Sequence, residues 1–203
     1  VGQRWKVYAS HFLGFALLGV SSNVLFVWGP HVLVRSFDMN IGEAGTLVGV
    51  IVLIFGTLGL VAGGSMSDRL LKRGLVDGGY RVGIVGAVGG IFVASLLSVT
   101  TSITMVSIAL CALVFFACLG FGAAAAALQQ VTPNRLRGVT SGFYFFLLNF
   151  IGIGLSPSLT ALLTNFVFQD ESMLISSVSV MVAGSGLLAA IVLWYGRPYY
   201  RSE

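Results

Sequence analysis

The chain has 203 residues, of which 57% are hydrophobic and only 9% carry a charge, and its formal net charge is +4. An ordinary soluble domain has about 25% charged residues, so this composition excludes a fold whose whole surface faces water. The mean hydropathy of +0.97 indicates that lipid surrounds most of the molecule.

Six stretches are long and apolar enough to cross a membrane as helices, because about 20 residues rising 1.5 Å each span a hydrocarbon core of about 30 Å. Lipid offers no hydrogen-bond partner to an exposed backbone, and the alternating pattern of a membrane barrel strand is missing. The sequence therefore predicts an all-α polytopic membrane protein with a single six-helix domain over residues 1–203. In chain order, the predicted spans cover about residues 8–33, 44–66, 81–100, 103–128, 139–165 and 173–195.

The first predicted span carries one histidine near each end, His11 and His31. At 1.5 Å per residue they lie about 30 Å apart, so they cannot share a metal ion or a nucleophile. His11 lies about one turn into the helix, where we expect a histidine hydrated at the membrane interface. No zinc-protease motif, serine-hydrolase motif or intramembrane aspartate pair occurs in the sequence. We therefore expect no enzyme activity, no catalytic residue, no metal site and no cofactor.

The cations gather in alternate loops. The N-terminal segment, the loops after the second and fourth spans, and the C-terminal tail hold ten of the eleven lysines and arginines. Arg35 alone lies on the opposite side, together with Asp38, Glu43, Asp170 and Glu171. Because Lys and Arg are retained in the cytoplasm, this distribution predicts that both termini are cytoplasmic. No nucleic-acid-binding motif accompanies the cations, so the expected partners are membrane lipids of a plasma or inner membrane, and not nucleic acid.

The loop after the second span reads GGSMSDRLLKRG over residues 63–74. In one interpretation its cations anchor the topology beside the negative end of the preceding helix, and Asp68 is a local counter-ion to Lys72. The other interpretation is a resemblance: the loop is similar to the G-x-x-x-D-R-x-G-R-R/K signature of the major facilitator superfamily. The residues that carry the resemblance are Gly64, Asp68, Arg69, Lys72 and Arg73, while Leu71 replaces the usual second glycine.

Two longer stretches resemble spinster-like members of that superfamily. Residues 132–168 are similar to the loop between the tenth and eleventh helices of these transporters and to the eleventh helix itself. The first two spans, with residues 28–49, are similar to the seventh and eighth helices. The resemblance covers essentially the whole chain and implies the C-terminal six-helix half of a twelve-helix transporter, built as two inverted three-helix repeats. Its implied partners are a small-molecule solute and an N-terminal six-helix half.

The resemblance also implies that two loops act in gating. In the family, the acid of this loop faces a helix N-terminus of the other half when the cytoplasmic side is closed, and here that acid is Asp68. By symmetry, the start of the fifth span receives the acid of the other half, with Arg135 and Arg137 nearby. A carboxylate at a helix N-terminus gains about 0.3 to 1 kcal/mol when exposed and up to about 2 kcal/mol when partly buried, which is enough to bias two conformations.

A solute site near the bilayer midplane, between the two halves, is a further implication of the resemblance. Asn23 and Asn149 are the first candidates, because an amide at mid-membrane depth either bonds a neighbouring helix or faces a wet cavity. Plain hydrogen bonding between helices is the open alternative. The other predicted lining residues are Ser22, Phe26, Tyr144 and Phe145. In the same fifth span, Gly154 and Pro157 indicate either close packing or a hinge, of which packing is favoured.

The predicted function is alternating-access transport of a small organic or amphipathic solute. No Asp, Glu, Lys or Arg lies in the inner two thirds of any predicted span, so this half offers no carboxylate to a proton relay. A six-helix channel or membrane scaffold acting as a homo-oligomer is the alternative function.

Overall fold

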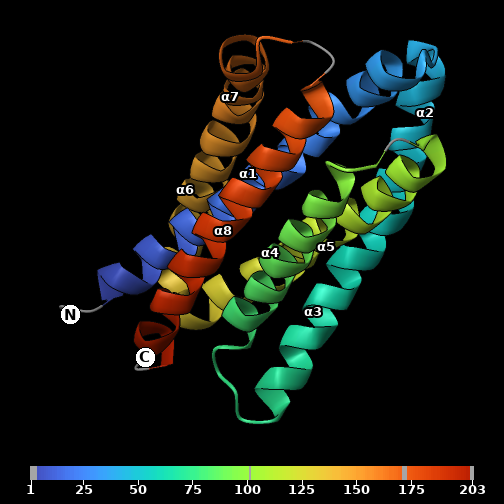
Figure 1. The fold of residues 1–203 in the computed structure, drawn as a ribbon. Coiled ribbons are helices and arrows are strands. Elements are labelled where there is room, and N and C mark those ends of the chain that lie inside the picture. The colour runs from blue at the N-terminus through green and yellow to red at the C-terminus, as the bar shows by residue number, and fades with distance from the viewer. Residues whose placement is uncertain (1–3, 101, 171–172, 202–203) are drawn as a thin grey trace.

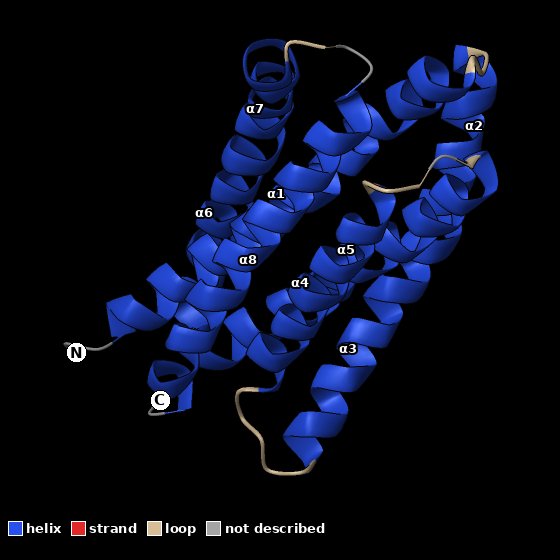
Figure 2. Cartoon of the chain, in the orientation of Figure 1, coloured by secondary structure: helices blue, strands red, loops and turns tan. Residues whose placement is uncertain are grey.

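The computed structural model describes residues 4–100, 102–170 and 173–201, and every regular element in these ranges is helical (Figure 2). Glu171, one of the acids named above, lies outside the described residues. The helices are α1 (Arg4–Phe37), α2 (Ile41–Ile51), α3 (Thr57–Lys72), α4 (Gly78–Leu97), α5 (Ile103–Val131), α6 (Arg137–Asn149), α7 (Ser156–Leu162) and α8 (Leu174–Arg201). Three π-helical turns, η1 (Val52–Gly56), η3 (Phe150–Leu155) and η4 (Leu163–Phe168), and one 3₁₀ turn, η2 (Asn134–Leu136), join them.

These elements form six rods that are long and apolar enough to cross a membrane, which confirms the predicted all-α membrane fold. Two rods are composite: α2, η1 and α3 run on without a break over Ile41–Lys72, and η2, α6, η3, α7 and η4 run on over Asn134–Phe168. The first rod, α1, extends beyond both ends of the expected span over residues 8–33.

The rods pack in two layers. One layer contains α3, α5, α1 and the rod built from α6 and α7, each in contact with the next. The other layer contains α4 and α8: α4 packs against α5 and α8, and α8 packs against α1. Both termini and the α3–α4 loop lie toward one end of the bundle, and the α1–α2 and α7–α8 connections lie at the other (Figure 1). We call the first of these the basic end, because the loops and termini there carry most of the cations.

Glycine allows α3 and α5 to approach closely. A Cβ atom built on Gly63 would collide with the backbone carbonyl of Leu119, and one on Gly122 would collide with that of Leu60. The two helices therefore pack backbone against backbone, as small residues permit in membrane bundles.

The two composite rods are the least covered by the rest of the chain. Within the most apolar 18-residue stretch of each rod, the buried share is 28% for the rod Ile41–Lys72 and 17% for the rod Asn134–Phe168. The same share is 61% for the rod Trp5–Phe37. Lipid or another membrane segment must cover these two rods.

The turn η3 separates the two interpretations of the glycines in the fifth rod. Gly152 is packed, because a Cβ there would lie 2.7 Å from the Asn23 side-chain nitrogen of α1. Gly154 has open space around its Cβ position, with only its own helix backbone at 4.0 Å. Packing therefore explains Gly152 but not Gly154, which lies inside the π-helical turn that precedes Pro157. A π-helical turn ahead of a proline is a frequent cause of a bent helix.

Candidate functional site

The loop that resembles the superfamily signature begins in the last turns of α3. Asp68, Arg69, Lys72 and Arg73 are all exposed there. Gly64 faces α5, where its Cβ position lies 3.7 Å from the Gly122 carbonyl oxygen. Among the described residues no ion pair joins Asp68 to Lys72, so the structure does not support the local counter-ion interpretation.

The end of α3 is fixed by its backbone. Gly74 has φ +81°, donates its N–H to the Leu71 carbonyl, and is followed by Leu75, whose N–H reaches the Leu70 carbonyl. This pair of hydrogen bonds is a Schellman motif, which requires the left-handed backbone that glycine adopts without strain. The turn directs the chain from the exposed cations toward Asp77.

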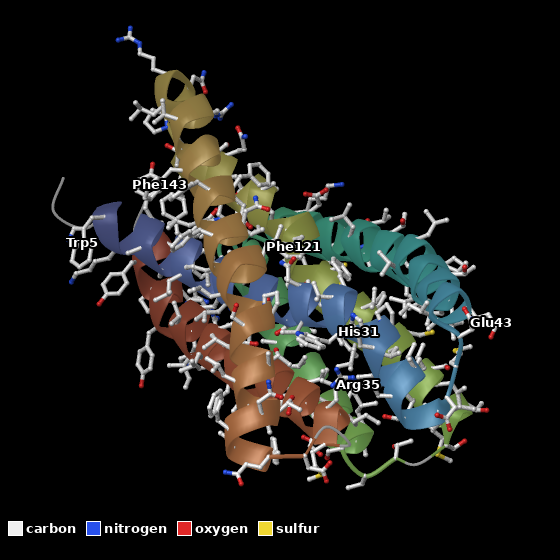
Figure 3. All side chains as sticks on the ribbon, turned by 90° about the horizontal axis from the view of Figure 1, so that it is seen from above. Trp5, His31, Arg35, Glu43, Phe121 and Phe143 are labelled. Carbon is white, nitrogen blue, oxygen red and sulfur yellow. The ribbon has the colours of Figure 1, made fainter. Side chains whose placement is uncertain are left out.

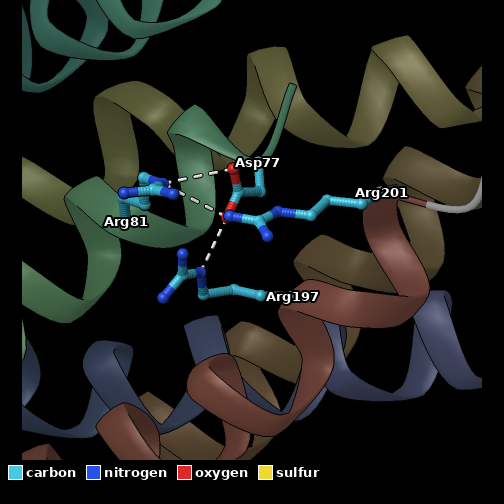
Figure 4. Close-up of polar contacts among 4 residues, drawn as sticks. All are labelled: Asp77, Arg81, Arg197 and Arg201. Carbon is cyan, nitrogen blue, oxygen red and sulfur yellow. Dashed lines mark hydrogen bonds and ion pairs between the residues drawn. The ribbon is translucent and has the colours of Figure 1, made fainter. Parts of the chain in front are cut away.

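Asp77 is the centre of a charge cluster that the sequence analysis did not predict. Its side chain is fully buried and contacts three arginines (Figure 4). Arg81 Nε, one turn further along α4, lies 3.2 Å from both carboxylate oxygens. From α8, Arg197 Nε donates to Oδ2 at 2.7 Å and Arg201 Nη2 lies 3.0 Å from the same oxygen. The cluster therefore joins α4 to α8 at the basic end.

The pKa of Asp77 reflects two opposing effects. Burial acts to raise the pKa, but the hydrogen bonds from Arg197, Arg201 and Arg81 outweigh it and lower the pKa to about 2. The carboxylate is therefore charged throughout the physiological range. The Arg81 partner could have been found from its i, i+4 spacing, whereas Arg197 is 120 residues away in sequence and only the fold brings it close.

The other two predicted gating cations lie at the start of the fifth rod, Arg135 in η2 and Arg137 at the first position of α6. Arg137 donates from Nη2 to the Gln129 carbonyl at 3.1 Å and from Nε to the Thr132 carbonyl at 3.3 Å, so it satisfies carbonyls at the end of α5. Arg135 is exposed. Leu136, the residue that precedes α6, makes no side-chain capping hydrogen bond, and the Cβ position of Gly138 meets open space.

The two candidate asparagines bond their own helices. The Asn23 amide donates to the Gly19 carbonyl at 2.9 Å, beside the point where α1 crosses η3 at Gly152. The Asn149 amide donates to the Phe145 carbonyl at 2.7 Å on an exposed part of α6. Neither amide bonds a neighbouring helix among the described residues, so the open alternative of interhelical hydrogen bonding is not seen here.

The other predicted lining residues divide into exposed and buried pairs. Phe26 and Phe145 are exposed. Ser22 and Tyr144 are buried between helices. Tyr144 is covered because the N-terminal part of α6 lies across α1, where its ring contacts those of His11 and Phe12.

The expectation of a hydrated His11 is wrong. The residue is 0% exposed, and neither ring nitrogen has a hydrogen-bond partner among the described residues. Aromatic rings surround it instead: Phe15 at 4.7 Å, Tyr144 at 5.4 Å and Tyr80 at 5.9 Å between centroids. Tyr80 of α4 and Tyr144 of α6 cover that face of α1. In the part of the chain that the structure describes, no three His, Cys, Asp or Glu residues could hold a metal ion.

An open apolar groove of about 630 Å³ lies between α1 and α6 toward the basic end. Trp5, Phe12 and Leu13 form its α1 side and Val139, Phe143 and Leu147 its α6 side. Trp5 and Phe143 are both labelled in Figure 3. None of the six predicted lining residues borders this groove. The signal in the sequence was the spacing of Trp5, Phe12 and Leu13 on one helical face.

Two bacterial transporters are similar to this chain in sequence. An MFS-type efflux pump of Mycolicibacterium smegmatis is 27% identical over 195 residues, which cover 94% of this chain and 44% of the pump. A hexuronate transporter of Bacillus subtilis is 28% identical over 198 residues, which cover 92% of this chain and 44% of that transporter. The chain thus spans less than half the length of these relatives. No family model matches the sequence.

Two solved structures of a bacterial homolog to the human lysosomal transporter Spinster, both inward-facing, have the same fold. The unoccupied form superposes with a TM-score of 0.68 at 17% identity, over 96% of this chain and 46% of that chain. The occupied form gives 0.64 at 19% identity, over 97% and 48%. The predicted resemblance to part of a major facilitator superfamily transporter is confirmed by these relatives, and the likeness to the spinster homolog is one of fold. The relatives are transporters and not enzymes, in agreement with the sequence prediction.

Proposed function

We propose that the chain acts as the C-terminal half of a twelve-helix carrier that moves a small organic or amphipathic solute across a membrane by alternating access. The observation that carries the proposal is that this six-helix fold matches just under half of each transporter, while its two composite rods are left largely uncovered. A second six-helix half would cover these rods and complete a central pathway. No comparison favours the alternative of a six-helix channel or scaffold.

The charges at the basic end support the gating part of the proposal. Asp68 lies in the last turns of α3, where the helix dipole is negative, and it has no ion pair among the described residues. A carboxylate in that position is unfavourable within its own helix, so a helix N-terminus from outside the chain would stabilise it. In the same way, the N-terminus of α6 beside Arg135 and Arg137 offers N–H donors to an external carboxylate. We propose that both contacts form only when the basic end is closed.

The groove between α1 and α6 suggests the solute class. Its walls are almost wholly apolar, and the Tyr8 hydroxyl at its edge is already bonded to the Val131 carbonyl. A sugar acid, as the name of the Bacillus subtilis relative describes, would find few hydrogen-bond partners there. We therefore propose a solute with an apolar part in the groove and an acidic group toward Arg135, with Asn23 and Asn149 contacting it at greater depth.

The orientation follows from the charges. Because the N-terminus, the C-terminus and the α3–α4 loop share the basic end, we propose that this end faces the cytoplasm.

Uptake by proteoliposomes that contain the full-length protein tests the proposal. We expect saturable uptake of an amphipathic organic acid, with counterflow of labelled solute, and a shifted inward–outward balance in Asp68→Asn. Asp38→Asn is the matched control: Asp38 is exposed at the opposite end and has φ +52°, a backbone that asparagine tolerates. Uptake without saturation or counterflow would favour a channel. An Asp68→Asn protein that behaves as the control would remove the gating role.

A further inference from the structure

Helices α4 and α8 pack against each other, and each exposes a row of apolar side chains. On α4 the exposed residues Val85, Val88 and Phe92 follow Arg81 at intervals of four, three and four, so all four share one helical face. On α8 the exposed residues Leu187, Ile191 and Trp194 precede Arg201 at intervals of four, three and seven, so they share one helical face with it. Each stripe is therefore apolar along its length and ends in an arginine at the basic end.

The two arginines belong to the Asp77 cluster, which holds them at one place. The cluster contains three guanidinium groups and one carboxylate among the described residues, so its formal charge is +2. Each guanidinium has five N–H donors, and the contacts to Asp77 use only the Nε groups of Arg81 and Arg197 and one Nη group of Arg201. Arg81 and Arg201 are also 33% and 47% exposed, so donors remain for a further anion.

The depth of the cluster fits the headgroup region of a bilayer. Trp194 and Tyr195 are 60% and 71% exposed about one turn before Arg197, and the Arg197 guanidinium lies 4.8 Å from the centre of the Trp194 ring. Exposed tryptophan and tyrosine beside basic residues mark the membrane–water interface. The apolar stripes then extend from the cluster into the hydrocarbon layer.

We propose that this surface is a binding site for one anionic phospholipid, whose phosphate is held by Arg81 and Arg201 and whose acyl chains lie along the α4 and α8 stripes. Guanidinium groups bind phosphate oxygens through paired N–H donors, and basic pockets between membrane helices are suited to anionic headgroups. Asp77 weakens the attraction for the phosphate, because its carboxylate cancels one of the three positive charges. The proposal does not depend on the transported solute, because the groove and the two asparagines lie on α1 and α6.

The test uses purified full-length protein in neutral detergent micelles, with thermal unfolding followed while phosphatidylglycerol is added. We expect saturable stabilisation by phosphatidylglycerol and none by phosphatidylcholine. Each arginine contributes about a fivefold change in affinity, so Arg201→Gln should need about fivefold more lipid and Arg81→Gln/Arg201→Gln about 25-fold more. The charge-matched control, Arg69→Gln/Arg73→Gln, should bind as the wild type does.

Asp77→Asn distinguishes the lipid site from a purely structural cluster. This variant raises the cluster charge to +3, so we expect it to bind phosphatidylglycerol about fivefold more tightly although it unfolds at a lower temperature without lipid. Weaker binding by this variant, an equal loss in the control pair, or no response of the wild type would overturn the proposal. Equal stabilisation by inorganic phosphate alone would also overturn it, because a free anion would then be the ligand.

Discussion

Replacing Asp77 with asparagine removes the one negative charge that holds Arg81, Arg197 and Arg201 together. Asparagine has almost the same volume as aspartate, so the packing around the N-terminus of α4 is retained. What changes is that three guanidinium groups face one another at contact distance from a neutral amide. Arg197 is affected most, because its side chain is only 14% exposed and can regain little hydration.

Two independent arguments give the loss in the free energy of unfolding that Asp77→Asn should cause. Breaking a buried ion pair by removing one partner costs about 3 to 5 kcal/mol, and the lower end applies here because Arg81 and Arg201 are partly hydrated. Independently, lowering the pKa of Asp77 from 3.8 to about 2 corresponds to roughly 2.5 kcal/mol of stabilisation at neutral pH. We therefore expect Asp77→Asn to lower the free energy of unfolding by about 2 to 3 kcal/mol.

Thermal unfolding of the purified protein in neutral detergent measures this loss. Asp68→Asn is the matched control, since Asp68 is an exposed aspartate at the same end of the bundle with no ion pair among the described residues. The control should stay within about 0.5 kcal/mol of the wild type. If the two variants unfold at the same temperature, the cluster does not stabilise the α4–α8 pair, and our account of its energy is incorrect.

Three further outcomes follow from the same structure. Acidification should remove the Asp77 contribution, because a carboxylate with a lowered folded pKa stabilises fully above pH 4 and loses that effect as the pH falls toward 2; an acid titration in which Asp77→Asn lacks this step checks it. Gly63→Ala should destabilise the protein by about 1 to 3 kcal/mol, because its Cβ meets the Leu119 backbone, whereas Gly184→Ala, at an open position of α8, should be neutral or slightly stabilising in the same melting experiment. His11→Phe should keep the ring contacts with Phe15 and Tyr144 and remove two unpaired nitrogens, so its unfolding temperature should not fall, and a loss above about 1 kcal/mol would mean that the imidazole has a partner that the fold does not reveal.

The rods could be predicted because the signal for each is local. Hydropathy over about 20 residues determines whether a segment enters lipid, and no distant partner is needed for that inference. The joins inside the rods were less predictable. The turns η1, η3 and η4 keep the chain helical, so they leave the apolar run unbroken and change only the hydrogen-bond register.

The faces of the rods were harder to assign than the rods themselves. Helical spacing places Phe12, Asn23 and Phe26 on one side of α1, but spacing alone cannot show that α6 crosses this side near the basic end. That crossing buries Tyr144 and His11, and it leaves the groove bordered by Trp5 on its other side. Which residues face a neighbour depends on the crossing of two helices that are more than 100 residues apart in sequence.

The two aspartates of the α3–α4 region show what the sequence conveys about charge and what it does not. Asp68 and Asp77 lie in the same cation-rich segment, and a count of charges treats them alike. The fold separates them: Asp77 is buried among three arginines of its own chain, whereas Asp68 stays exposed at the unfavourable end of α3. A carboxylate that is already satisfied inside one rigid unit has little to gain from a partner outside it, so Asp77 is suited to holding α4 against α8 in every conformation. Only Asp68 retains binding energy that a second half could use, and for that reason substitution of Asp68 should alter conformational balance while substitution of Asp77 alters stability.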